Sequence, residues 1–244
     1  MNTSAASPFR TLSIDGRISV QLPQARSVVI LVPHPDDEVL GCGLLIARLM
    51  RAGVRVTVIA LTDGDASHPG SVRWPPALLA RVRRAEMRRA MQRLGAARSR
   101  LHFMGWHDGR VGTEARPLRV AKLCHAAGAG LVLAASVDDH HPDHQACFQI
   151  GRGVARRLRL PLVSYAVWSR LSETAAHRRA NRDRAAKNWA MAAHRSQISN
   201  YIADAPSGFR LSQSALAQFI AGPERYNSTT NPIAKKPHTQ KEPD

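Results

Sequence analysis

The chain has 244 residues, 44% of them hydrophobic, which is enough for one domain with a substantial core and short for two. Its formal net charge is +17, so its field would attract phosphates, nucleic acid or an anionic membrane surface without choosing among them. The longest apolar run, VVILV, is far too short to span a bilayer, and the three cysteines are scattered without a CxxC motif; the sequence therefore indicates no membrane anchor, disulfide framework or cysteine zinc site and favours a cytoplasmic location.

Strands and helices alternate along most of the chain. An uninterrupted, β-branched apolar run predicts a buried strand at 27–32, and helical apolar spacing follows at 40–53. Later strands are expected at 54–65, 100–106, 131–137 and 161–168, and later helices at 77–95, 118–130, 143–158 and 187–202. This alternation predicts an α/β fold, Rossmann-like, with a mostly parallel sheet and helices on both faces.

The alternation breaks after about Ser169, where an arginine-rich segment leads to the last predicted helix. The final stretch of the chain is polar, proline-bearing and lysine-rich, so it cannot bury enough apolar surface to order itself. We therefore predict a single domain over residues 1–226 and a disordered tail over residues 227–244.

The motif HPDDE follows the first predicted strand directly. Open parallel sheets bind ligands at the carboxyl ends of their strands, so this motif lies where a site is expected. His34 with Asp36 and Asp37 can give a metal one nitrogen and one oxygen ligand and leave a second carboxylate free to act on a water molecule. Gly41 and Gly43 would let the following helix start close to a bound group.

A second motif, HPDH, lies within VDDHHPDHQA at the end of the fourth predicted strand. His141 and His144 are three residues apart at a loop-to-helix junction, so both can face one centre. An ordinary alternative is a helix cap, with Asp143 in that role. Two such motifs at two strand ends favour a metal site, and two histidines and a carboxylate with an open position are typical of a catalytic one.

These motifs resemble those of the PIG-L/LmbE-like N-acetylglucosaminyl deacetylases, which carry HPDD near the amino end and HPDH later. Further segments that resemble family positions are Arg83 with Glu86, GWHDG at 105–109, and the spaced pattern K..A...H.SQ from Lys187 to Gln197. The resemblance covers residues 27–200. It implies a Rossmann-like fold and zinc-dependent removal of N-acetyl groups from glucosamine-containing substrates.

The resemblance also implies roles for the residues of the two motifs. His34, Asp37 and His144 correspond to the ligands of Zn²⁺. Asp36 corresponds to the general base that acts on a zinc-activated water, and His141 to the group that stabilises the oxyanion. These roles agree with the chemistry of amide hydrolysis, in which an expelled amine needs a proton and an oxyanion needs a hydrogen-bond donor.

Arg83 and Asp108 match positions that contact sugar in relatives, with Arg84 as the adjacent alternative to Arg83. Lys187 and His194 are expected to support the site. The implied partner is a small-molecule amino sugar, whether free, conjugated, or linked to a lipid or nucleotide, and an anionic carrier would suit the basic surface. No specific nucleic acid is expected, and the oligomeric state is left open.

Two rival functions use the same residues differently. A non-haem iron enzyme also uses two histidines and a carboxylate, but it has no need for Asp36 and is expected on a β-barrel. A basic nucleotide- or nucleic-acid-binding α/β protein would make both motifs incidental, and the sequence has no Walker motif or GxGxxG to support it.

Overall fold

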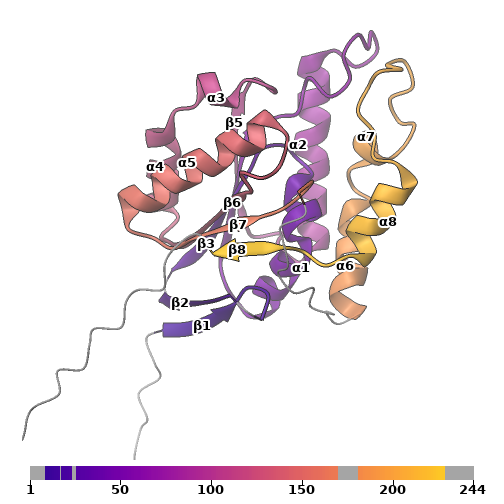
Figure 1. Ribbon diagram of the computed structural model, residues 1–244. Helices are drawn as coiled ribbons and strands as arrows, with labels where there is room; N and C mark the ends of the chain where they lie inside the picture. Colours follow the sequence, from indigo (N-terminus) through magenta and orange to yellow (C-terminus); the bar gives the residue numbers. More distant parts are fainter. Residues whose placement is uncertain (1–8, 17, 24–25, 170–180, 229–244) are drawn as a thin grey trace, which may run out of the picture.

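The computed structural model describes residues 9–16, 18–23, 26–169 and 181–228. A six-stranded sheet forms its centre (Figure 1). In spatial order the strands are β5 (Arg100–Trp106), β4 (Val56–Thr62), β3 (Ser27–Val32), β6 (Ala129–Ala135), β7 (Leu162–Tyr165) and β8 (Tyr226–Ser228). All neighbouring strands are parallel except β7 and β8. The predicted α/β fold with a mostly parallel sheet is confirmed.

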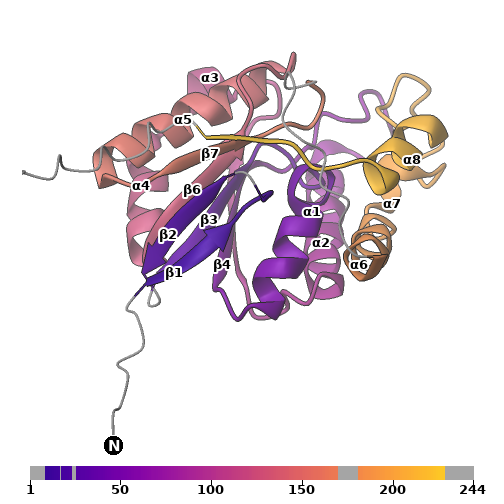
Figure 2. The same ribbon diagram turned by 60° about the horizontal axis from the view of Figure 1, so that its bottom comes forward.

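Helices cover both faces of this sheet (Figures 1 and 2). One side carries α1 (Asp37–Arg51), α2 (Pro76–Arg93) and α6 (Asn181–Met191), with α7 (Arg195–Ile198) and α8 (Gln213–Ala221) beyond them. The other side carries α3 (Val111–Glu114), α4 (Pro117–Ala126) and α5 (Pro142–Leu158). A separate antiparallel hairpin is formed by β1 (Phe9–Ser13) and β2 (Ser19–Pro23). Within the described ranges no helix is both long and apolar enough to cross a membrane.

The central strands are buried along their whole length, as expected for parallel strands covered on both faces. Helix α1 approaches β7 and α6 closely because two of its positions lack side chains. A Cβ atom on Gly41 would lie 2.4 Å from the ring of Tyr165, and one on Gly43 would lie 3.0 Å from Cγ of Lys187. These glycines therefore admit protein side chains, where the sequence analysis expected them to make room for a bound group.

The expected long helix over 187–202 is wrong. Helix α6 ends at Met191 and α7 begins at Arg195, and His194 lies at the break between them. The imidazole of His194 is fully buried and contacts Glu38 of α1. At the far end, β8 includes residues 227 and 228, which the sequence analysis assigned to the tail, and residues 229–244 lie outside the described part.

Candidate active site

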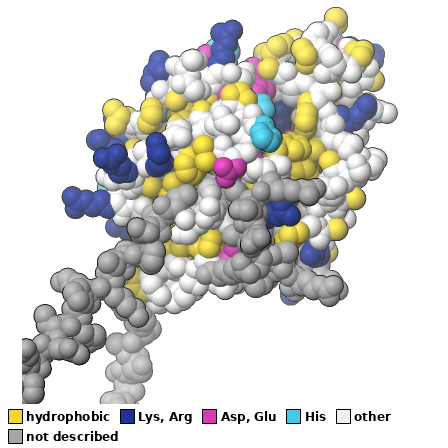
Figure 3. All heavy atoms as spheres, viewed as in Figure 1, with side chains coloured by type: hydrophobic (Ala, Val, Ile, Leu, Met, Phe, Trp, Pro, Cys, Tyr) yellow, Lys and Arg dark blue, Asp and Glu magenta, His cyan; other side chains and the backbone are white. Residues whose placement is uncertain are grey.

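The predicted site residues meet at the carboxyl edge of the sheet, where parallel strands of this fold class bind ligands. His34, Asp36 and Asp37 follow β3, and the two histidines of the second motif follow β6. All of them line a cavity of about 800 Å³. The other lining residues are Ala66, Ser67, Pro69, Arg83, Asp108, Gly109, His140, Pro142, Trp168, Gln197, Ser207 and Phe209. On the face drawn in Figure 3, histidine and acidic side chains gather between hydrophobic ones near the top.

Three buried side chains converge on one point within this cavity. Oδ2 of Asp37 lies 3.2 Å from Nδ1 of His34 and 3.4 Å from Nε2 of His144. Metal–ligand bonds of about 2.0–2.2 Å in a tetrahedral site place neighbouring ligand atoms about 3.3 Å apart. The observed distances have this size, so the donor set fits a zinc ion with three protein ligands and one open position.

In each of the two histidines, the ring nitrogen that points away from Asp37 contacts a carboxylate. Nδ1 of His144 lies 2.8 Å from Asp139, and Nε2 of His34 lies 3.0 Å from Asp108 and 3.3 Å from Asp143. When these nitrogens donate to the carboxylates, the opposite ring nitrogens keep lone pairs directed at Asp37. This carboxylate–histidine pairing is typical of metal ligands, because it fixes the tautomer and orients the ring.

A second group with metal-ligand atoms is formed by His34, Asp108 and His141. It fits a cation less well because His141 caps α5, where its Nδ1 accepts the backbone N–H of Asp143 at 3.2 Å. A neutral imidazole has one lone pair, and this cap uses it. The geometry therefore favours the set that contains Asp37, and it leaves His141 with an Nε2–H donor. It also shows that the cap is His141, where the sequence suggested Asp143.

Without a cation the ligand set holds protons. Burial lowers the pKa of His144, but the charge of Asp37 and the hydrogen bond to Asp139 outweigh it and raise the pKa to about 9. Burial likewise lowers the pKa of His34, and its carboxylate partners raise it well above its usual value. Burial would raise the pKa of Asp37, but the two histidines hold it well below its ordinary range. Such a set releases protons when a metal binds.

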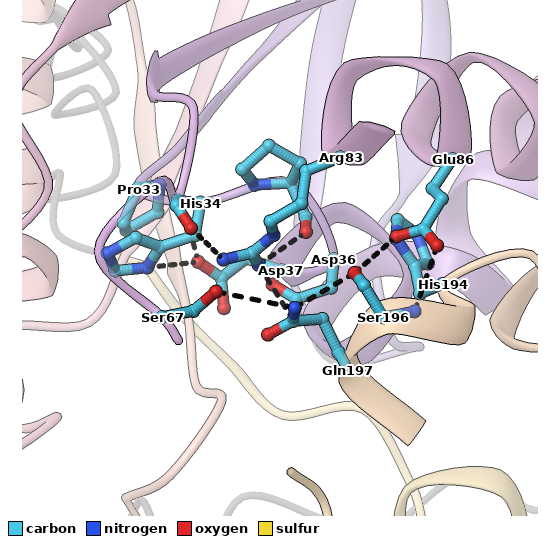
Figure 4. A network of polar contacts seen from close by, with 12 residues as sticks. Pro33, His34, Asp36, Asp37, Ser67, Arg83, Glu86, His194, Ser196 and Gln197 are labelled. Atoms are coloured by element: carbon cyan, nitrogen blue, oxygen red, sulfur yellow. Dashed lines mark hydrogen bonds and ion pairs between the residues drawn. The ribbon is translucent and has the colours of Figure 1, made fainter. Parts of the chain in front are cut away.

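Asp36 takes no part in this ligand set. Its backbone φ is 146°, a region that non-glycine residues rarely adopt and that costs about 1–3 kcal/mol. Its N–H donates to Glu38 at 2.9 Å, and its carboxylate lies 3.2 Å from Nη2 of Arg83 (Figure 4). Burial raises the pKa of Asp36 to about 6 against the opposing charge of Arg83.

Arg83 is almost fully buried, and its guanidinium donates to the carbonyl oxygens of Gly64 and Pro35 at 2.9 and 2.8 Å. Gly64 has a φ of 65°, and a Cβ atom there would collide with this guanidinium. Arg84, the neighbouring alternative, pairs with Asp63 outside the cavity lining. Of the two arginines, only Arg83 faces the cavity.

The spaced pattern between Lys187 and Gln197 also reaches this edge. Ser196 donates through N and Oγ to Glu86 at 2.9 and 2.6 Å, and its Oγ accepts Nε2 of Gln197 at 2.9 Å (Figure 4). Lys187 does not line the cavity and forms a buried ion pair of 2.9 Å with Glu224. The carboxylate of Glu224 also accepts hydrogen bonds from two backbone N–H groups of α1. These residues support the elements that carry the site.

Sequence reasoning missed Asp139 and the contact between Glu38 and His194, although it expected His194 to support the site. Asp139 is fully buried behind His144, and only the acidic pair before the second motif could have suggested it. The pair of Glu38 and His194, at 2.9 Å, joins residues 156 positions apart and leaves no local signal. Burial lowers the pKa of His194, but the charge of Glu38 outweighs it and raises the pKa above its usual value.

Glu38→Ala is expected to destabilise the protein by about 3–5 kcal/mol, because it leaves a fully buried histidine without its counter-charge. Glu38→Gln, which can still accept the N–H of Asp36, should cost clearly less. Urea unfolding of both variants beside the wild type measures the difference. Equal stability of Glu38→Ala and wild type would show that the pair contributes nothing.

A family model described as GlcNAc-PI de-N-acetylase, PIG-L, matches residues 29–155, just over half of the chain. The chain is also 34% identical over 92 residues to a 1D-myo-inositol 2-acetamido-2-deoxy-alpha-D-glucopyranoside deacetylase from Kineococcus radiotolerans. That match covers 36% of this chain and 25% of the relative, so the chain spans about a quarter of the length of this curated protein.

Two solved structures share the fold. N,N'-diacetylchitobiose deacetylase from Pyrococcus horikoshii has a TM-score of 0.64 at 19% identity, with 83% of this chain and 84% of that chain covered. GalB, the 4-carboxy-2-hydroxymuconate hydratase from Pseudomonas putida, has a TM-score of 0.62 at 15% identity, with 86% and 98% covered. At these identities the likeness shows the fold alone, and the two neighbours carry different named activities.

Proposed function

Because the chain belongs to the PIG-L family of GlcNAc-PI de-N-acetylases, we propose that it is a zinc-dependent hydrolase that removes an N-acetyl group from an N-acetylglucosamine-type substrate. One observation carries the proposal: beside the ligand set of His34, Asp37 and His144 there is a further buried carboxylate, Asp36, which that set does not use. Metal-assisted amide hydrolysis needs such a group.

In this proposal His34, Asp37 and His144 would hold a zinc ion, which would polarise the amide carbonyl and lower the pKa of a bound water towards about 7. Asp36 takes the proton of the attacking water and returns it to the departing amine. Arg83 and Glu38 hold Asp36 in place, one at its carboxylate and one at its N–H. These contacts with buried partners offset the conformational cost of the strained backbone at Asp36 and keep its carboxylate directed into the cavity.

His141 supplies the donor for the developing oxyanion. Burial lowers the pKa of His141, and positive charge at the neighbouring His34 and His144 lowers it further, so its imidazole is neutral near pH 7. The cap at Nδ1 then leaves the proton on Nε2, where a neutral donor serves a tetrahedral intermediate. Asp108 lines the cavity at the same edge, and we assign it with Arg83 to the sugar.

The acid limb of the rate profile should report Asp36. The base must be deprotonated, and its pKa before a cation binds is raised from 3.8 to about 6, so kcat/KM should fall about tenfold per pH unit on the acid side of a midpoint at or below about pH 6 and level off above it. A bound cation moves this limb to lower pH. Rates from about pH 4 to 8, with bound zinc measured at each pH, check it. If kcat/KM fell only in proportion to the loss of bound zinc, the assignment of Asp36 as the base would be contradicted.

The activity itself is tested on a panel of N-acetylglucosamine conjugates with zinc-loaded protein. Hydrolysis of the amide releases acetate and a primary amine in equal amounts, and both are measured. A hydratase with the same fold would produce neither, so the two activities separate in one assay. Turnover without acetate, or acetate release unaffected by removal of zinc, would overturn the proposal.

A further inference from the structure

Two aromatic side chains line the cavity and remain partly exposed, and the part of the cavity beside them is called its mouth below. Trp168 follows β7 and is 40% exposed, and Phe209 lies in the loop after α7 and is 39% exposed. Their rings meet edge to face with centroids 6.1 Å apart. Trp168 also packs edge to face against Phe219 of α8, with centroids 5.4 Å apart, but Trp168 and Phe209 both stay partly exposed and keep apolar surface available to a ligand.

Backbone hydrogen bonds hold this aromatic pair in place. The N–H of Trp168 donates to Asp139 at 3.0 Å, and the N–H of Phe209 donates to the carbonyl of Ser67 at 2.7 Å. Asp139 is the same carboxylate that orients His144. Asp139 thus binds both the backbone at Trp168 and the ring of His144, which fixes the position of Trp168 relative to the reacting centre.

The cavity is larger than a single amino sugar requires. Cavities of about 300–1,000 Å³ hold drug-sized ligands, and this one, at about 800 Å³, lies in the upper part of that range. The sugar is assigned to the part of the cavity near Arg83 and Asp108, so the space beside Trp168 and Phe209 remains for the group to which the sugar is attached. Pro69 and Ala66, both exposed, add apolar surface there.

The described lining offers little to an anionic carrier. Its only arginine or lysine is Arg83, and both terminal nitrogens of this guanidinium are bound to backbone carbonyls, with Asp36 beside them. On the face drawn in Figure 3, Lys and Arg side chains are scattered and do not gather beside the histidines. Within the described residues, the lining of this cavity therefore carries no cluster of positive charge.

We propose that Trp168 and Phe209 form a binding site for an apolar, aromatic or alkyl group linked to the amino sugar, which makes the substrate an apolar N-acetylglucosamine conjugate. The inference rests on the proposed deacetylase function. The apolar face of such a group removes the exposed surface of both rings from water, a gain that free N-acetylglucosamine does not provide at this position.

The test compares phenyl β-N-acetylglucosaminide with free N-acetylglucosamine. Wild type should prefer the phenyl glycoside in kcat/KM by about tenfold or more, from the apolar area buried. Trp168→Ala and Phe209→Ala should each lose most of this preference, mainly through KM of the glycoside, and Trp168→Phe should retain it. Trp189→Ala is the matched control, because Trp189 is 62% exposed on α6, outside the cavity lining.

Calorimetric titration with phenyl β-glucosaminide, which carries no acetyl group, makes the test independent of turnover. Weaker binding to Trp168→Ala than to Trp189→Ala by about tenfold supports the site even if no deacetylation is found, in which case only the proposed function fails. Equal loss of activity on both sugars, or equal binding by the two variants, overturns the inference. Melting temperatures of all variants identify any that fail to fold. If Trp168→Ala does not fold, the same comparison is made with Phe209→Ala.

Discussion

Replacing Asp37 by alanine is expected to abolish zinc binding and turnover together. Oδ2 of Asp37 lies within 3.4 Å of a ring nitrogen of both His34 and His144, so the substitution removes the oxygen ligand and the negative charge that the two histidines share. Two neutral imidazoles alone hold zinc poorly, because structural and catalytic sites need at least three protein ligands. Zinc is measured by elemental analysis after dialysis, beside kcat.

Asp63→Ala is the matched control for this substitution. Asp63 is also a buried carboxylate at the end of a neighbouring strand, but it pairs with Arg84 and does not line the cavity. It should keep one zinc ion per chain. If Asp37→Ala retained zinc like this control, the ligand set would be assigned wrongly.

Asp36→Asn is expected to keep its zinc and to lower kcat by about 10³, within the 10²–10⁴ range for loss of a general base. The amide has nearly the same shape as the carboxylate, and its oxygen can still accept from Arg83. It cannot accept the proton of the attacking water. Zinc content and kcat of this variant should therefore separate, which a purely structural role of Asp36 would not produce.

The opposite outcome is informative for this position. Should Asp36→Asn lose zinc while Asp37→Ala keeps it, the two aspartates have been assigned the wrong way round. Should Asp36→Asn keep both zinc and full turnover, the base is another group, and the raised pKa of Asp36 has no catalytic meaning.

The fold was predictable where local pattern and burial agree. The strand over 100–106 is observed with the predicted bounds, and the buried strand over 27–32 likewise. The hairpin of β1 and β2 was missed, because its short strands mix polar and apolar residues and pair only with each other. The break between α6 and α7 was missed because no glycine or proline marks it; what lies there is the buried contact of His194 with Glu38.

The site was predictable to the level of its two motifs. Their positions after β3 and β6 follow from the rule that parallel sheets bind ligands at strand ends, and the structure brings His34, Asp37 and His144 together. The groups that support these residues were not predictable. Asp139, for example, contacts both His144 and the backbone N–H of Trp168, about 30 positions away. Contacts of this kind depend on strand order, which one sequence does not reveal.

The described residues offer two ligand sets for one metal, and an anomalous difference map at the zinc edge, from crystals grown with zinc, distinguishes them most directly. We predict a single peak about 2.0–2.2 Å from Nδ1 of His34, Oδ2 of Asp37 and Nε2 of His144. Asp36 and His141 should stand beside that peak without ligating it. A peak held by Asp108 and His141 in place of Asp37 and His144 would contradict the account.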